Sequence, residues 1–182
     1  AEFTAFCDEY LQRLFDVCKQ EVDLETGHRV RARDLLAIYS AGGHARKLAF
    51  DDDHDLIILL NSDDPEVRRY SVRIITRMNR EIVRRGTMPH YRFAERFGEY
   101  VTTFSELRSL FADPDETSFI DMSQLVGARQ VVGSSSFEAE LREEIIEPFI
   151  FSRSEEFARQ VAAGIRSRHA AVAAGVISRH DI

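Results

Sequence analysis

The sequence has only two cysteines, and this shortage excludes a fold held together by disulfides. Cys7 and Cys18 fall on one predicted helix, about 16 Å apart at the usual helical rise of roughly 1.5 Å per residue. That separation is too large for the two thiols to form a bond with each other. Both are therefore expected to be buried free thiols, as in proteins of a reducing compartment.

The sequence also lacks long apolar runs and an excess of positive charge. Its longest purely apolar run is far shorter than the roughly 18 residues that a membrane span needs, and its first residues do not show the charged, apolar and small pattern of a signal peptide. A cytoplasmic protein without a membrane partner is expected. The formal net charge is −7, so the basic excess that favours binding to nucleic acid is missing, and no nucleic-acid partner is expected.

A pair of glycines followed by closely spaced acids is the most informative pattern that the chain does contain. Gly42 and Gly43 precede Arg46, and Asp53 and Asp55 then stand at the start of an apolar run. Alternate residues of a strand point to the same face, so both carboxylates can ligate one hard divalent cation. The glycines allow backbone N–H groups to approach phosphate closely. The pattern predicts a metal-dependent nucleotide site.

This pattern resembles that of the nucleotidyltransferase superfamily that includes DNA polymerase beta. Gly42, Gly43, Arg46, Asp53 and Asp55 are most similar to the motif of enzymes that uridylylate the PII signalling protein or adenylylate glutamine synthetase. The resemblance implies Asp53 and Asp55 as catalytic metal ligands for Mg²⁺ or Mn²⁺. It implies Gly42, Gly43 and Arg46 as binding residues for a nucleoside triphosphate such as ATP. The implied acceptor is a PII-like or glutamine synthetase-like protein.

Two other acidic motifs are excluded by the residues around the acids. A calcium-binding loop that starts at Asp51 would need glycine and glutamate at its sixth and twelfth positions, where this chain has Leu56 and Ser62. The haloacid-dehalogenase phosphatases have a strand before their acids, whereas the predicted strand here follows them. The histidines show no zinc-like spacing with each other or with a cysteine.

The superfamily normally supplies a third carboxylate, which completes the second metal site and can accept the proton of the attacking hydroxyl. Asp121 is the residue to which we assign this catalytic role, and Glu95 and Glu99 remain alternatives. Relatives often carry an acid two residues before an arginine that matches Arg129. Gly127 occupies that position here. If catalysis requires that acid, this protein has lost it.

The predicted fold is α/β, with a small mixed sheet, packed helices and a helical C-terminal extension, and no internal repeat is visible. Residues 1–40 are predicted to form N-terminal helices that pack on the core, residues 41–133 the nucleotidyltransferase core, and residues 134–182 the extension. The final residues look like an interruption, so a fragment of a longer protein is expected. The helices and strands are predicted from apolar periodicity, from β-branched content and from turn signals. Helices are predicted at residues 3–18, 30–40, 65–85, from 105, 119–132, 137–150 and 154–174, and strands at 55–60 and in two short segments around Gly98.

The expected function is transfer of a nucleoside monophosphate from a nucleoside triphosphate to a hydroxyl group. One alternative is a catalytically impaired nucleotide-binding regulatory module that keeps the first acid pair only. Another is a protein-interaction domain that uses an arginine-rich helix face. That face is a stripe opposite the apolar side of the helix at residues 65–85, and it is also what a solvated surface helix would show. It consists of Arg69, Arg73, Arg77, Arg80 and Arg84.

Overall fold

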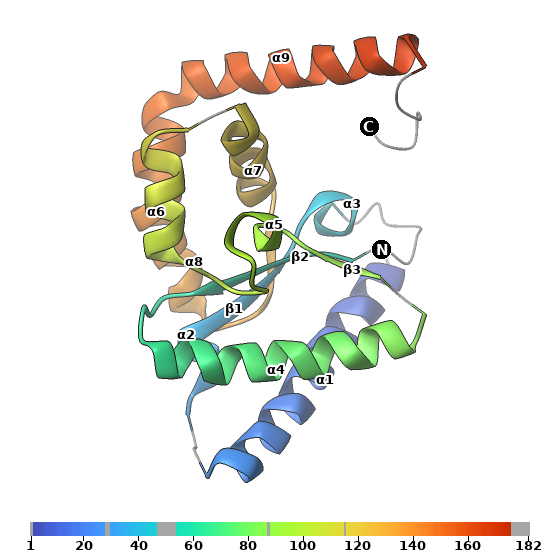
Figure 1. Cartoon of the computed structure of the whole chain (residues 1–182), viewed down its shortest axis with the longest axis vertical. Coiled ribbons are helices and arrows are strands. Elements are labelled where there is room, and N and C mark those ends of the chain that lie inside the picture. The colour runs from blue at the N-terminus through green and yellow to red at the C-terminus, as the bar shows by residue number, and fades with distance from the viewer. Residues whose placement is uncertain (1, 28–29, 47–53, 87, 115, 176–182) are drawn as a thin grey trace.

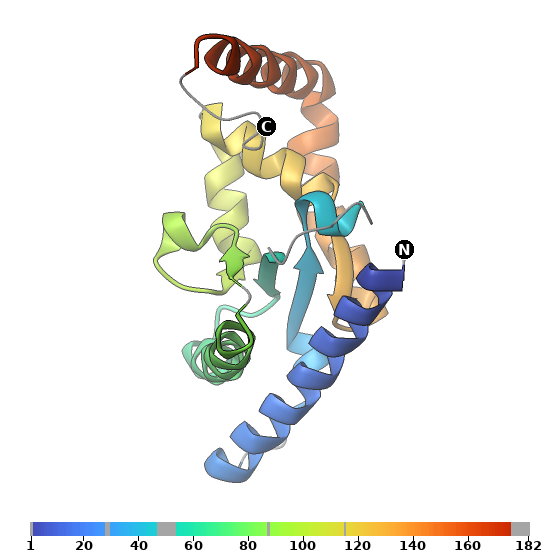
Figure 2. The same cartoon turned by 90° about the vertical axis from the view of Figure 1, so that its right-hand side faces the viewer.

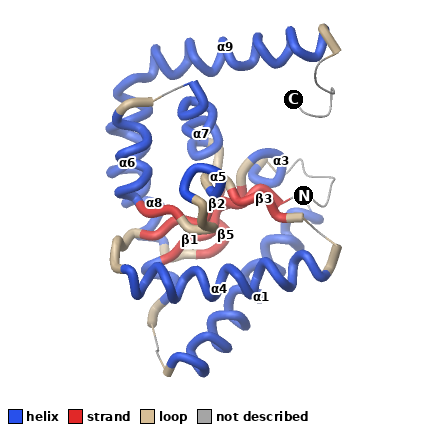
Figure 3. Tube along the Cα trace, in the orientation of Figure 1, coloured by secondary structure: helices blue, strands red, loops and turns tan. Residues whose placement is uncertain are grey.

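A mixed β-sheet lies between two layers of helices in the computed structural model, which describes residues 2–27, 30–46, 54–86, 88–114 and 116–175 (Figures 1 and 3). In this part of the chain the strand order is β3-β2-β1-β5, and β4 pairs with β2 beside β3. The strands are β1 (Leu36–Ser40), β2 (His54–Leu60), β3 (Pro89–Tyr91), β4 (Thr102–Thr103) and β5 (Arg129–Val132). The α/β class and the small mixed sheet with packed helices are thus as predicted.

The centre of the sheet is the antiparallel pair β1 and β2. Ser40 is registered with Leu56, so the end of β1 lies beside the start of β2. β5 is antiparallel to β1, whereas β3 and β4 are parallel to β2. All of β1 and nearly all of β2 is buried, as in strands covered on both faces. Residues directly after β1 are therefore held against the first residues of β2.

The predicted helix at residues 30–40 is wrong. Only α2 (Ala32–Leu35) is helical there, and the following five residues form β1. A short apolar run that is buried on both faces has no polar alternation, so periodicity alone cannot separate a central strand from a buried helix. The sheet therefore includes part of the segment that was assigned to N-terminal helices.

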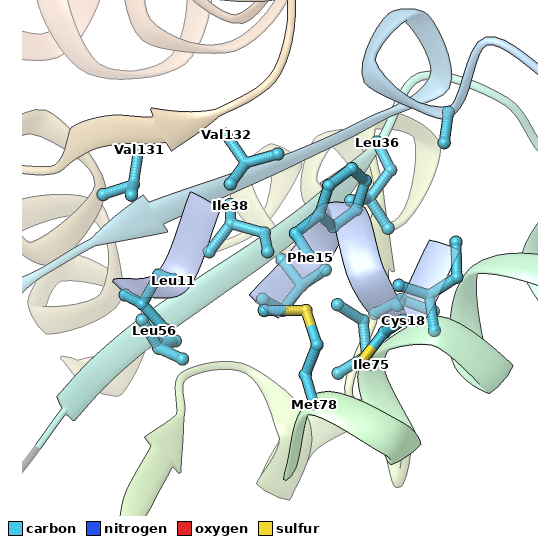
Figure 4. Close-up of a cluster of buried hydrophobic side chains, with 14 of the residues drawn as sticks. Leu11, Phe15, Cys18, Leu36, Ile38, Leu56, Ile75, Met78, Val131 and Val132 are labelled. Atoms are coloured by element: carbon cyan, nitrogen blue, oxygen red, sulfur yellow. The ribbon is translucent and has the colours of Figure 1, made fainter. Parts of the chain in front are cut away.

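One face of the sheet is covered by two long helices, α1 (Glu2–Thr26) and α4 (Pro65–Arg84), which pack against each other (Figures 1 and 4). The buried stripe of α1 runs from Cys7 through Leu11, Phe15 and Cys18 to Val22. Phe3 and Phe6, which were predicted to share it, are 44% and 67% exposed. α4 begins where predicted, because Asp64 caps it by accepting a hydrogen bond from Glu66 N and Pro65 occupies its first turn.

Shorter helices cover the other face of the sheet. They are α6 (Phe104–Ala112), α7 (Glu116–Val126), α8 (Ser135–Leu141) and the π-helix η1 (Arg142–Ile150), which contains Pro148. After η2 (Phe151–Arg153), α9 (Ser154–Ala173) runs along the end of the molecule away from the sheet and contacts α7 (Figures 1 and 2). α9 has no buried residue.

Two further elements differ from the predictions. The predicted helix at residues 119–132 ends at Val126, and its last four residues form β5 instead. The two predicted strands around Gly98 are present only as β3 and β4, and the helical turn α5 (Ala94–Phe97) separates them. Among the described residues, no helix combines the length and apolar character needed to cross a bilayer.

Candidate functional site

The glycine turn lies directly against Asp55. It forms α3 (Gly42–Ala45), which follows β1 after a single residue, and Ala41 N donates a hydrogen bond of 2.9 Å to Asp55 O. Gly42 has a φ of +58°, and a Cβ added there would lie 2.4 Å from Asp55 Oδ2. Only glycine combines this backbone conformation with this close approach. The structure therefore brings together two of the predicted site residues.

The remaining predicted residues of the motif are placed less tightly. A Cβ at Gly43 would meet no heavy atom within 4 Å, so this position does not require glycine for space. Arg46 caps the end of α3, and its side chain is exposed. Asp53 lies outside the described residues. Asp55 is thus the one member of the predicted acid pair for which the structure shows side-chain contacts.

Asp55 forms an ion pair with an arginine that the sequence analysis did not single out. Arg92 Nη2 lies 2.9 Å from Asp55 Oδ1, and their side chains are 41% and 22% exposed. The backbone holds this arginine in place, because Arg92 N donates to Leu56 O at 2.8 Å. Arg92 Nε is buried and has no hydrogen-bond partner among the described residues. It therefore keeps one unused donor beside the carboxylate.

A cavity of about 530 Å³ adjoins this ion pair, and its wall carries two guanidinium groups and one carboxylate. Phe93 in this wall is the one described non-glycine residue with positive φ, at 68°, which is a strained conformation of the kind found at functional sites. Burial raises the pKa of Tyr91, so its hydroxyl stays protonated. The side chains that line the cavity include His90, Tyr91, Arg92, Phe93, Arg96 and Asp121. Both guanidinium groups already have a carboxylate partner, Asp55 for Arg92 and Asp121 for Arg96.

The candidates for the third carboxylate lie in different surroundings. Asp121 lines the cavity and accepts a hydrogen bond of 2.8 Å from Arg96 Nε. Glu99 pairs with Arg68 at 2.6 Å and is about half exposed. Glu95 belongs to α5 rather than to the strand that was predicted for it, and its side chain is outside the described part. Of the carboxylates whose side chains are described, Asp121 is the candidate that lines this cavity.

The segment around Gly127 is not part of the cavity wall. Gly127 follows the end of α7, and its N–H donates to Ser123 O at 3.3 Å. Arg129, two residues later, forms two hydrogen bonds to Asp8 in α1, at 2.7 and 2.9 Å. Arg129 therefore anchors the N-terminal helix to β5.

A second cluster, made of potential metal ligands, lies on the opposite face of β2. Cys7, His44 and His54 are all buried, and one ligand atom from each lies within 4.8 Å of the others. This cluster could hold a metal ion. The sequence analysis named none of these three residues as a metal ligand. Spacing in sequence gave no signal, because the three residues belong to α1, α3 and β2 and meet only in the folded chain.

The two cysteines have the state that was predicted for them. Both are buried and free of disulfides, and Cys18 lies further along α1, within the hydrophobic core. Burial raises the pKa of the Cys18 thiol to about 11, so it stays protonated at neutral pH.

Comparison with known proteins does not add to this description: the chain matches no protein-family model, and it has no match among curated proteins.

Proposed function

We propose that this protein is a metal-dependent nucleotidyltransferase that transfers a nucleoside monophosphate from a nucleoside triphosphate to a hydroxyl group. The observation that supports this most is the close approach of Gly42 to the Asp55 carboxylate, at the point where β1 ends beside the start of β2. The turn provides backbone N–H donors for phosphate, and the carboxylate that it contacts provides a ligand for a cation in the same place.

In the proposed reaction the acceptor oxygen attacks the α-phosphorus of the triphosphate. The bond from that phosphorus to the oxygen bridging to the β-phosphate breaks, and pyrophosphate leaves with the electron pair. Asp53 and Asp55 would hold Mg²⁺ or Mn²⁺, which neutralises charge on the phosphates. Asp121 would accept the proton of the attacking hydroxyl. Gly42, Gly43, Arg46 and the arginines of the cavity would orient the triphosphate.

The cavity supports an anionic substrate in particular. Arg92 and Arg96 are its cationic side chains, and Arg92 Nε offers a buried donor with no partner among the described residues. A guanidinium group binds phosphate through paired hydrogen bonds. When a cation occupies Asp55, Arg92 becomes available to the phosphates.

The first test is nucleotide binding by calorimetry with each of the four common nucleoside triphosphates, with and without Mg²⁺. We expect Mg²⁺-dependent binding of at least one of them, and a loss of affinity of at least tenfold in Asp55→Asn. Asp113→Asn is the matched control, because Asp113 is an exposed carboxylate just after α6. The proposal fails if no triphosphate binds, or if both variants bind equally well.

The second test is transfer of label from an α-labelled triphosphate to PII protein or glutamine synthetase, with release of pyrophosphate measured in parallel. Transfer that is lost in Asp55→Asn supports the enzyme. A nucleotide-binding regulatory module is the second candidate, because Gly127 stands where the enzymes that the motif resembles often carry an acid, and Asp121 is already paired with Arg96. Tight, Mg²⁺-dependent binding without transfer to either protein would favour the module.

A further inference from the structure

We propose that Cys7, His44 and His54 form a buried binding site for a borderline transition-metal ion, with Zn²⁺ as the preferred occupant. Their side chains are 4%, 3% and 7% exposed, and the ligand atoms lie within 4.8 Å of one another. Ligand atoms around a tetrahedral zinc ion lie roughly 3.5 Å apart, given bonds of about 2.0–2.3 Å. Side-chain movements of about 1 Å would therefore complete the coordination.

The hydrogen bonds of His44 prepare one of its nitrogens for a metal. His44 Nε2 lies 3.2 Å from Asp8 Oδ1, and the same carboxylate accepts two hydrogen bonds from Arg129. An ionised carboxylate only accepts, so Nε2 carries the hydrogen and the lone pair of neutral His44 is on Nδ1. Nδ1 is buried and has no hydrogen-bond partner among the described residues. In zinc sites the ring nitrogen of a ligating histidine that does not bind the metal usually donates a hydrogen bond to a carboxylate, which orients the ring.

The donor set selects the class of ion. One thiolate and two imidazoles suit Zn²⁺, Co²⁺ or Cu²⁺, whereas Mg²⁺ and Ca²⁺ require oxygen ligands. The described residues supply three donors, so a water molecule or a fourth side chain would complete the site. Burial of all three side chains excludes a substrate from them, which argues against a catalytic cysteine–histidine pair. The two imidazole rings meet edge to face, with centroids 5.2 Å apart.

The site would join three segments that are remote in sequence. Cys7 lies in α1, His44 directly follows the glycine pair, and His54 lies between Asp53 and Asp55. Neighbouring residues of a strand point to opposite faces, so the metal would lie on one side of β2 while the Asp55 side chain points to the other side, toward Arg92. The ion would thus link α1 to α3 and to β2, the two elements that carry the glycine and acid motifs of the proposed nucleotide site. This role does not depend on whether nucleotide transfer occurs.

The test is titration of chelator-treated protein with Co²⁺, which replaces zinc and gives a sulfur-to-metal charge-transfer absorption when a thiolate binds it. We expect one Co²⁺ per chain with this absorption, and displacement by Zn²⁺ but not by excess Mg²⁺. The matched variants are Cys7→Ala and Cys18→Ala, which truncate two buried cysteines of the same helix. The absorption should persist in Cys18→Ala and disappear in Cys7→Ala.

Further variants separate this site from the nucleotide site. His44→Gln and His54→Gln should each weaken Co²⁺ binding at least tenfold, and Asp8→Asn about 10–100-fold. Asp55→Asn should leave the absorption unchanged. If Cys7→Ala does not fold, Cys18→Ala still decides, because Cys7 is then the only thiol in the chain. Absence of the absorption in wild type and Cys18→Ala, or its persistence in folded Cys7→Ala, would overturn the proposal.

Discussion

The two faces of the sheet are packed in different ways. On the face of α1 and α4, two helices of 25 and 20 residues bury mainly aliphatic and sulfur-containing side chains, and Phe15 is the single phenylalanine among the described residues of that cluster. The opposite face is covered by helices of 7–11 residues and is rich in phenylalanine. Its phenylalanines are Phe93, Phe104, Phe111, Phe119 and Phe137. A short helix presents few side chains to a core, so large rings supply the buried area.

The same division separates the two proposed cation sites. His54, Leu56, Ile58 and Leu60 face α1 and α4, while Asp55 and the alternate residues after it face the other way. Adjacent residues of β2 therefore place an imidazole in the buried cluster and a carboxylate on the opposite face, against the Arg92 that lines the cavity. Because side chains alternate along β2, the strand places nitrogen and oxygen ligands on opposite faces of the sheet.

The largest expected effect comes from removing a ring from either core. Phe15→Ala and Phe137→Ala truncate fully buried residues on opposite faces and should each lower the free energy of unfolding by about 3–5 kcal/mol. Urea denaturation followed by circular dichroism measures this loss. If both faces belong to one cooperative unit, each variant shows a single transition. Two separate transitions would show that the faces unfold independently.

A smaller effect is expected from the glycine turn. Gly42→Ala introduces a side chain at φ +58° and 2.4 Å from Asp55 Oδ2, and should cost about 1–3 kcal/mol of stability. Gly43→Ala is the matched control, because its Cβ meets no atom within 4 Å, and should change stability by less than about 1 kcal/mol. Thermal denaturation of the pair tests this difference. Equal losses would contradict the close approach described here.

Alkaline pH should weaken the α1 and α4 face first. Burial raises the pKa of Cys18 from 9.0 to about 11 and also raises the pKa of Tyr70 and Tyr91, all three in or against that core. The folded state holds these protons more tightly than the unfolded chain. Their stabilisation is therefore complete below about pH 9 and is lost as the pH rises through the folded values.

Urea denaturation between pH 8 and 11 measures this loss, with a slope of up to roughly 1.4 kcal/mol per pH unit for each proton. Cys18→Ala should reduce the slope between pH 9 and 11. Tyr39→Phe, on the opposite face, should reduce it only at higher pH, because the ordinary pKa of tyrosine is 10.0. An unchanged slope in Cys18→Ala would contradict the assignment of the titrating thiol.

The smallest expected effect on stability is that of Arg46→Met. Its side chain is exposed at the end of α3, so the free energy of unfolding should change by less than about 0.5 kcal/mol. Affinity for a triphosphate should nevertheless fall if Arg46 binds phosphate. Parallel denaturation and calorimetry, with the exposed Arg85→Met as the control, separate these outcomes. Equal loss of affinity in both variants would instead indicate a general effect of removing positive charge.

The local signals in the sequence predicted the elements that have clear ends. α4 follows from Asp64 and Pro65 and from its apolar stripe, and β2 follows from an apolar run that a turn ends. β1 and β5 were missed because their identity comes from neighbours: β1 is a strand because β2 and β5 lie on either side of it. Tertiary context overrides local pattern in such segments.

The candidate site was predictable to a similar degree. The contact between Gly42 and Asp55 fits the motif, since the glycine turn was expected beside the start of the strand at residues 55–60, although a helix and not β1 was predicted before that turn. The pairing of Asp55 with Arg92 and of Asp121 with Arg96 was not visible, because ion pairs across a fold leave no mark in local sequence. The cluster of Cys7, His44 and His54 was hidden for the same reason.

The ion pair between Asp55 and Arg92 has a consequence for how ligands would act on one another. If the proposed cation binds Asp55, it would compete with the guanidinium group that now pairs with this carboxylate, and the released Arg92 would be able to bind a phosphate. Each ligand would strengthen the binding of the other by the same factor, because such linkage is reciprocal. The metal and the triphosphate would therefore bind with positive cooperativity, through one arginine that exchanges partners.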